Sequence, residues 1–235
     1  YNKLIQKDPK DYTKREYLIN LDQGVGIHLG LAFVYYNWFD KKNKLFQNFW
    51  QKELGKGHFY FIKTVGDQIF EKKESLEVIK SRGVNIQKLK DKIKDFMKWL
   101  VTSHKAKEDL KAFSWWINFE VKFFDRQFYL DLIKNVLEIT EGDLDIDYQL
   151  EENLDKIVSI NKEKAFEIVK LFYLNKAKNA GKGKYVHIDK KIIAIFKALY
   201  ENKKTKEKTE RLINDLITEA GEFGNLFWPL EEIVG

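Results

Sequence analysis

The 235-residue chain contains no cysteine and only two prolines, Pro9 and Pro229. The lack of cysteine excludes disulfide bonds and thiolate metal sites, and it is typical of proteins in the reducing cytoplasm. Because proline is the commonest interruption of a helix, the long stretch between the two prolines can form a series of helices. No apolar run approaches the roughly 18 to 20 residues that a membrane span requires. We therefore predict a cytoplasmic protein with no membrane partner.

An initiator methionine is also lacking, and the first 22 residues are polar and irregular, with no apolar signal segment. We expect the chain to be a fragment of a longer protein whose missing part is N-terminal. Residues 1–22 are then a lead-in that belongs to a preceding domain, and residues 23–235 form one helical-repeat domain.

Apolar residues are present at helical spacing, in steps of three and four, along most of the chain. Strict alternation, the pattern of a half-buried strand, is nowhere sustained. The pattern predicts ten helices, with apolar stripes in the ranges 27–38, 45–50, 59–69, 86–100, 110–117, 130–137, 150–157, 165–172, 188–199 and 212–220. The sixth is expected to end near Gly142 and the tenth at Gly221 or Gly224 as a left-handed cap, with a flexible loop at 179–184.

The predicted helices pair into hairpins that begin near residues 23, 57, 107, 147 and 187. These intervals are close to the roughly 40 to 47 residues of HEAT-like two-helix repeats. A single hairpin cannot bury its apolar face, so stacking on neighbours must supply the missing side. We predict an all-α fold, a HEAT-like α-solenoid of about five helical hairpins, with a compact multi-helix bundle as the alternative.

Charge is distributed unevenly around a net value of +6. Residues 80–107 contain nine basic and two acidic residues, whereas residues 138–155 contain eight acidic and no basic residues. This asymmetry predicts a polarised surface, although lysine and glutamate can also simply solvate helix surfaces. The predicted interaction surface comprises Lys88, Lys90, Lys92, Lys94, Lys98, Lys105, Lys182 and Lys184.

Two glycine-containing segments partly match nucleotide-binding motifs. Residues 24–30 lack the third glycine of the dinucleotide fingerprint, since Leu29 occupies that position. Residues 181–184 are followed by Tyr185, where a phosphate-binding loop requires serine or threonine. We interpret the first as a site of close helix packing and the second as a basic loop between helices.

The aspartates of residues 143–147 alternate as at the start of a calcium loop. Tyr148 occupies the position that must be glycine, so the segment does not fit a calcium site. We predict instead that Asp145 or Asp147 caps the helix that follows, because an aspartate oxygen can accept from its free amides.

No catalytic constellation is recognisable. The histidines are His28, His58, His104 and His187, and no two of them have the i, i+4 spacing of a zinc helix. The chain has no cysteine nucleophile and no serine in a Gly-x-Ser-x-Gly turn. We predict no catalytic, cofactor-binding or metal-binding residues, and no enzymatic activity in this segment.

Several aromatic and leucine motifs resemble a known protein region. They are Phe-Ser-Trp-Trp at 113–116, Lys-Phe-Phe-Asp at 122–125, the leucines of 130–137, and Leu-Ile-Asn-Asp-Leu at 212–216 followed by Gly-Glu-Phe-Gly at 221–224. Together with Tyr-Tyr-Asn-Trp at 35–38, they resemble the C-terminal helical-repeat region of large bacterial anti-phage defence proteins. That group includes STAND-type P-loop NTPases and SIR2-like defence proteins.

The resemblance implies a sensor, oligomerisation or scaffold module whose parent protein carries an NTPase or NADase domain upstream. The implied partner is a phage protein or the parent chain's own effector domains, with homo-oligomerisation through the full-length protein. The residues also leave an alternative open, a nucleic-acid-binding helical domain. It would make weak contacts through the basic 80–107 face and the 181–184 loop.

Overall fold

The structure, a computed structural model, describes residues 125–235 without a break and residues 85–103 before them. It also describes the single positions 77, 80, 81, 83, 110, 111, 113 and 114. The chain divides into two compact units, Tyr1–Met97 and Lys98–Gly235. The helices predicted before residue 77 and the predicted boundary after residue 22 lie outside the described residues.

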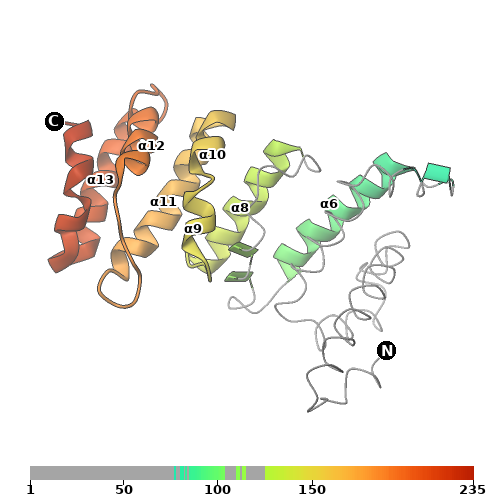
Figure 1. The fold of residues 1–235 in the computed structure, drawn as a ribbon, viewed down its shortest axis with the longest axis horizontal. Coiled ribbons are helices and arrows are strands. Elements are labelled where there is room, and N and C mark those ends of the chain that lie inside the picture. The colour runs from blue at the N-terminus through green and yellow to red at the C-terminus, as the bar shows by residue number, and fades with distance from the viewer. Residues whose placement is uncertain are drawn as a thin grey trace, which may run out of the picture. The chain divides into compact units, whose positions relative to one another are not determined.

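The described residues form helices and no strand, which confirms the all-α prediction. The elements are α6 (Ile86–Ser103), α8 (Arg126–Thr140), α9 (Asp147–Glu151), α10 (Leu154–Ile160), α11 (Lys162–Lys178), α12 (Lys190–Tyr200), α13 (Lys206–Ala220) and the 3₁₀ helix η3 (Gly221–Ile233) (Figure 1). None of the described helices has the length and apolar character needed to cross a membrane.

Four of these helices are preceded by a residue whose side chain accepts a hydrogen bond from a free backbone amide in the first turn. Such a cap contributes about 1 kcal/mol to a helix. The acceptors for α6, α8, α11 and α12 are, in order, Asn85, Asp125, Asn161 and Asp189, at 2.9–3.0 Å from the amide nitrogens. The starts of these helices are therefore fixed by residues that the sequence places directly before an apolar stripe.

The single helix predicted over 150–157 is two short helices, α9 and α10, interrupted at Asn153. The Asn153 side-chain amide donates to the carbonyl of Gln149 at 2.8 Å, so it takes the place of a backbone donor. This local competition between an asparagine side chain and the helix backbone is a common reason for a break.

The helices of the second unit pack in two layers (Figure 1). In one layer α11 lies between α8 and α13, and in the other α12 lies between α10 and η3. The core lies between the layers, where the buried rings of Tyr173 on α11 and Phe196 on α12 meet edge to face, 5.5 Å apart. Each helix thus buries its apolar stripe only through its neighbours.

The end of α8 approaches the backbone of α11 closely. Glu141 and Gly142, which follow the helix, both have positive φ angles, 54° and 81°. A Cβ atom at Gly142 would lie 2.1 Å from the carbonyl oxygen of Leu171. The helix therefore ends where predicted, and the glycine also provides the space for this contact.

Gly221 ends α13, as predicted, but its φ and ψ of 57° and −119° are not those of a left-handed cap. The chain continues as η3, which the sequence analysis missed. With three residues per turn, Gly224, Phe227 and Leu230 share one row. Phe227 and Leu230 are fully buried, and Gly224 lets this row approach the carbonyl of Ile217.

Candidate functional site

Six charged side chains of alternating sign form a continuous series where α9 and the ends of α8 and α11 meet the 179–189 loop. Their nitrogen–oxygen distances are 2.6 Å for Lys111–Asp143, 2.8 Å for Asp143–Lys184, 3.1 Å for Lys184–Asp147, 3.9 Å for Asp147–Lys176 and 2.5 Å for Lys176–Glu151. We call these six residues the charge ladder. Three ammonium groups balance three carboxylates, so the ladder has no net charge.

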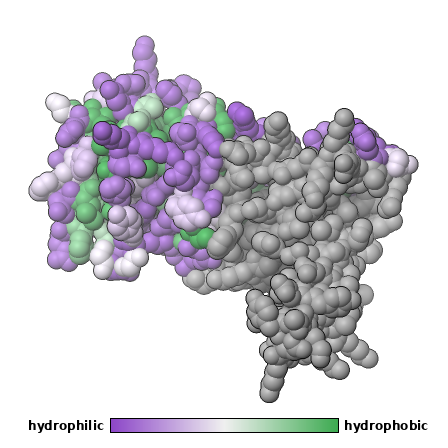
Figure 2. Space-filling view, in the orientation of Figure 1, coloured by the Kyte–Doolittle hydropathy of each residue, from purple (hydrophilic) through white to green (hydrophobic). Residues whose placement is uncertain are grey.

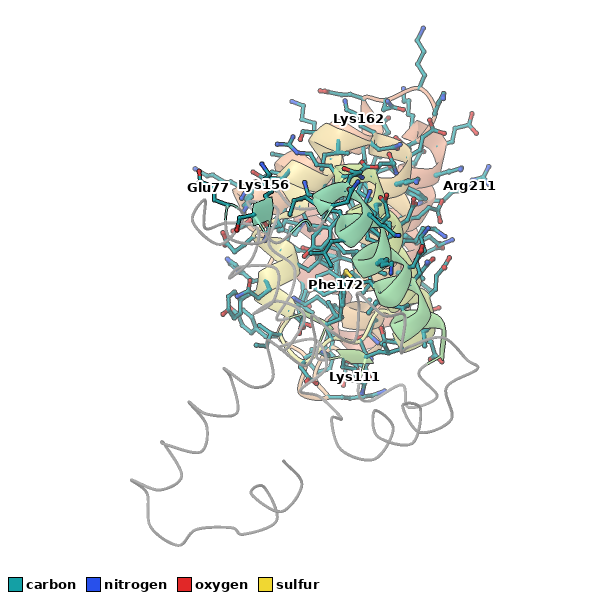
Figure 3. The ribbon with its side chains drawn as sticks, turned by 90° about the vertical axis from the view of Figure 1, so that its right-hand side faces the viewer. Glu77, Lys111, Lys156, Lys162, Phe172 and Arg211 are labelled. Carbon is teal, nitrogen blue, oxygen red and sulfur yellow. The ribbon has the colours of Figure 1, made fainter. Side chains whose placement is uncertain are left out.

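Lys176 is the most deeply buried member of the charge ladder, with 3% of its side chain exposed. Its ammonium nitrogen lies 5.1 Å from the centre of the Phe172 ring and 6.0 Å from that of Tyr173. Figure 3 shows Phe172 near the middle of the helices in that view. An ammonium group in such surroundings needs compensation for its lost hydration. The carboxylates of Glu151 and Asp147 provide it.

The hydroxyl of Tyr173 extends the series beyond Glu151, to which it donates a hydrogen bond at 3.4 Å. Burial of the phenol, followed by the negative charges of Glu151, Asp189 and Asp147, raises the pKa of Tyr173 well above its ordinary value. The phenol therefore stays protonated and acts as a hydrogen-bond donor. A group in this state is unsuited to act as a base or nucleophile near neutral pH.

The pKa values of Asp143 and Lys184 are shifted by each other and by their neighbours. Burial alone would raise the pKa of Asp143, but hydrogen bonds from Lys111 and Lys184 and their charges lower it. Burial alone would lower the pKa of Lys184, but hydrogen bonds to Asp143 and Asp147 and their charges raise it. Both shifts favour the charged forms, so each ion pair stabilises the fold.

We expect Asp143→Asn to destabilise the protein at neutral pH and to have a diminishing effect in acid. The lowered folded-state pKa means that Asp143 stabilises the fold fully above the unfolded value of about 3.9, and that this contribution is lost as the pH falls through the folded-state value. Urea unfolding of both proteins from pH 7 downward measures the difference. A penalty from the substitution that stays constant below about pH 4 would contradict this assignment.

Lys184 holds the 179–189 loop in place. Besides its two ion pairs, its ammonium donates to the carbonyl of Leu144 at 3.1 Å. At Gly181 the loop backbone lies directly against the ring of Phe223, and Val186 is buried. These contacts anchor a loop that the sequence pattern predicts to be flexible. The Lys184 ammonium is bound by other groups of the same chain.

The prediction that Asp145 or Asp147 caps the following helix is wrong. Ile146 precedes the first turn of α9, and its side chain makes no capping hydrogen bond. Asp147 lies within the first turn and faces Lys184 and Lys176. The carboxylate is therefore used by distant lysines, which no local pattern in the sequence indicates.

Ser114 connects the Phe-Ser-Trp-Trp segment to the acidic run. Its hydroxyl donates to the carbonyl of Lys111 at 3.0 Å and accepts from the amide of Ile146 at 3.1 Å, and the side chain is fully buried. The amide of Asp145 donates to the same Lys111 carbonyl. This serine fixes the start of the charge ladder, and sequence reasoning missed it because its Ile146 partner is 32 residues away.

The lysines predicted on α6 do not form one continuous basic face. Residues four apart share a side of a helix. The rows on the outer side are Lys90 with Lys94, then Asp91 with Asp95, then Lys88 with Lys92. Partial burial and the charge of Lys88 lower the pKa of Lys92. An acidic row thus separates the two basic rows.

The other lysines of the predicted interaction surface have different surroundings. The ammonium of Lys98 lies 5.5 Å from the centre of the Phe128 ring, and Lys182 is exposed in the 179–189 loop. Lys105 lies outside the described residues.

The acidic run 138–155 is largely neutralised by lysines of the same chain. The charge ladder accounts for three of its eight carboxylates, and Lys134 and Lys191 pair with Glu138 and Glu152. The negative charge that the sequence concentrates in residues 138–155 is therefore reduced in the folded chain, where lysines from other segments pair with it.

Large apolar side chains are exposed at few described positions. Tyr148 on α9, Tyr185 in the 179–189 loop and Trp228 on η3 are 57%, 77% and 59% exposed. The Tyr185 ring stacks on that of His187, with centroids 6.2 Å apart. On the face drawn in Figure 2, the described part of the chain is mostly hydrophilic with scattered apolar groups. Exposed tyrosine and tryptophan are the residues most often found at binding hot spots.

Among the residues that the structure describes, no three histidine, aspartate or glutamate side chains are arranged to hold a metal ion. Of the four histidines, only His187 is described. Comparisons with protein-family models, with curated proteins and with solved structures find no match to this chain.

Proposed function

We propose that the chain is a non-catalytic helical module that presents its surface to a protein partner. The observation that carries the proposal is the charge ladder. The ionisable side chains that converge in the second unit neutralise one another in ion pairs that join successive elements. Their arrangement is suited to holding a stack together, because each charge has an opposite neighbour.

The two-layer packing supports the proposal that the module is a HEAT-like α-solenoid. α11 contacts both α8 and α13, and α12 contacts both α10 and η3, so each inner helix is covered by the previous and the next pair. Stacked helix pairs expose extended surfaces that are suited to recognition. The exposed Tyr148 and Trp228 side chains are the residues that we expect to contact a partner.

The resemblance to C-terminal regions of anti-phage defence proteins suggests the setting. We propose that the partner is a phage protein or the effector domains of the parent chain. Nucleic-acid binding is the alternative, and it is less favoured because an acidic row divides the α6 lysines and because Lys184 is engaged in ion pairs. A fluorescence-anisotropy titration with DNA and RNA at low salt tests it, since phosphate contacts weaken steeply with salt.

The main test uses the full-length protein that carries this chain, in bacteria challenged with phage. We expect Trp228→Ser and Tyr148→Ser to reduce protection and the recovery of a co-purified partner, because they remove exposed apolar contacts. Lys204→Ser is the control, since its ammonium is exposed and pairs with the exposed Glu163.

A second variant separates recognition from catalysis. Tyr173→Phe removes the buried hydroxyl that contacts Glu151 of the charge ladder and leaves the ring in place. We expect it to fold and to protect as well as the wild type. A folded Tyr173→Phe protein without protection would contradict a non-catalytic role, and equal protection after deletion of residues 126–235 would rule out the module's contribution.

A further inference from the structure

The segment Tyr185–Asp189, the last part of the 179–189 loop before α12, follows an extended path along the second unit (Figure 1). It belongs to no helix or strand. Its side chains alternate: Tyr185, His187 and Asp189 are exposed, Val186 is buried and Ile188 is half-buried. This is the pattern of a β-strand with one face packed on a core. Tyrosine, valine and isoleucine are also residues that favour strands.

The backbone of this segment lacks the partners that a strand normally has. Within the described part of the chain, the backbone N–H and C=O groups of residues 186–188 make no hydrogen bond. An extended run of unpaired backbone groups is a template for pairing with another extended chain. The partner of this segment must itself be an extended peptide, because only an extended peptide offers hydrogen-bond donors and acceptors at matching intervals.

Both ends of the segment are held in place. At one end Lys184 is bound by Asp143 and Asp147, and at the other Asp189 accepts from the amide of Ile192 at 2.9 Å. Lys191 then contacts Glu152 at the end of α9. Because the segment is already ordered, pairing would lose little conformational entropy.

We propose that Tyr185–Asp189 pairs in antiparallel register with the same segment of a second copy of this chain, about a two-fold axis at His187. This inference rests on the proposed role in protein recognition. In this register Tyr185 faces Asp189 of the other copy, and the same pair occurs twice. One oxygen of Asp189 accepts from Ile192, and the other is suited to accept from the phenol. Tyr185 and Asp189 are therefore complementary across the pair, and His187 lies opposite its own copy on the axis.

Sedimentation velocity of the 235-residue chain over a wide range of concentration tests the proposal, with variants that change the sign of the cross-strand pair. Tyr185→Asp places two carboxylates opposite each other twice and is expected to weaken self-association about tenfold. Tyr185→Lys places an ammonium opposite Asp189 and is expected to retain it. Asn214→Asp adds the same negative charge at an exposed position on α13, outside the segment, and is expected to have no effect.

Hydrogen exchange then locates the contact. Because successive amides of a strand point to opposite edges, we expect either the amide of His187 or the amides of both Val186 and Ile188 to exchange more slowly as the concentration of the wild-type chain rises. A wild-type chain that stays monomeric, or a dimer in which the Tyr185→Asp and Tyr185→Lys proteins associate equally, would overturn the pairing. A monomeric chain would leave the proposed partner recognition through Trp228 intact. If the chain dimerises but the full-length protein does not protect bacteria against phage, the result would count against the proposed function alone.

Discussion

Lys176→Met is expected to lower the free energy of unfolding by about 2–4 kcal/mol, because it leaves the partly buried Glu151 carboxylate without its ammonium partner and Asp147 with Lys184 alone. The Lys176 side chain is 3% exposed, and Glu151 and Asp147 are 24% and 20% exposed. Methionine has a similar length and preserves the packing on the Phe172 ring, so the effect reports mainly on charge. Urea unfolding measures the change.

The matched control for this substitution is Lys204→Met. Lys204 also pairs with a glutamate, Glu163 at 2.7 Å, but 72% of its side chain is exposed. An exposed pair contributes little because water solvates both charges. Equal losses from the two substitutions would contradict a structural role for the buried pair. The charge ladder would then be no more important than an ordinary surface contact.

Gly142→Ala is expected to destabilise the protein by about 3–5 kcal/mol, since it combines backbone strain with a collision. Gly142 has a φ of 81°, and an added Cβ atom would lie 2.1 Å from the Leu171 carbonyl oxygen and 2.9 Å from the Asn175 Cβ atom. These are atoms of α11, which cannot move away without shifting the helix. α8 and α11 would have to separate at this end.

Gly183→Ala separates the two effects. Gly183 has a φ of 98°, but nothing lies within 4 Å of an added Cβ atom. It should show only the backbone strain, about 1–2 kcal/mol. Urea unfolding of both variants gives the part due to the collision as the difference. If Gly142→Ala is no more destabilising than Gly183→Ala, the close approach of α8 to α11 does not contribute to stability.

The helical class of the described residues could be predicted because it depends on local spacing. The stripes at 130–137, 165–172 and 212–220 each lie within one observed helix, and the stripe at 188–199 begins just before α12. Helix boundaries are harder to predict where a side chain competes with the backbone for hydrogen bonds, as Asn153 does between α9 and α10. The 3₁₀ helix η3 was missed because a period of three residues in a short apolar tail does not stand out from a helical period of 3.6.

The candidate site could be predicted only in part. The sequence shows the acidic run containing Asp143 and Asp147, but its local pattern predicts only a helix cap. Its partners Lys111, Lys176 and Lys184 lie about 25 to 40 residues away in sequence, at distances that no local motif connects.

By itself, the sequence determined the helical character and the capping of several helices, because both depend on side chains within one or two turns. Tertiary structure alone decided which charges meet. Opposite charges that are far apart in sequence attract strongly only after packing removes the water between them. The same packing decided that Lys184 holds the 179–189 loop through ion pairs, whereas the sequence alone predicts Lys184 as part of an interaction surface.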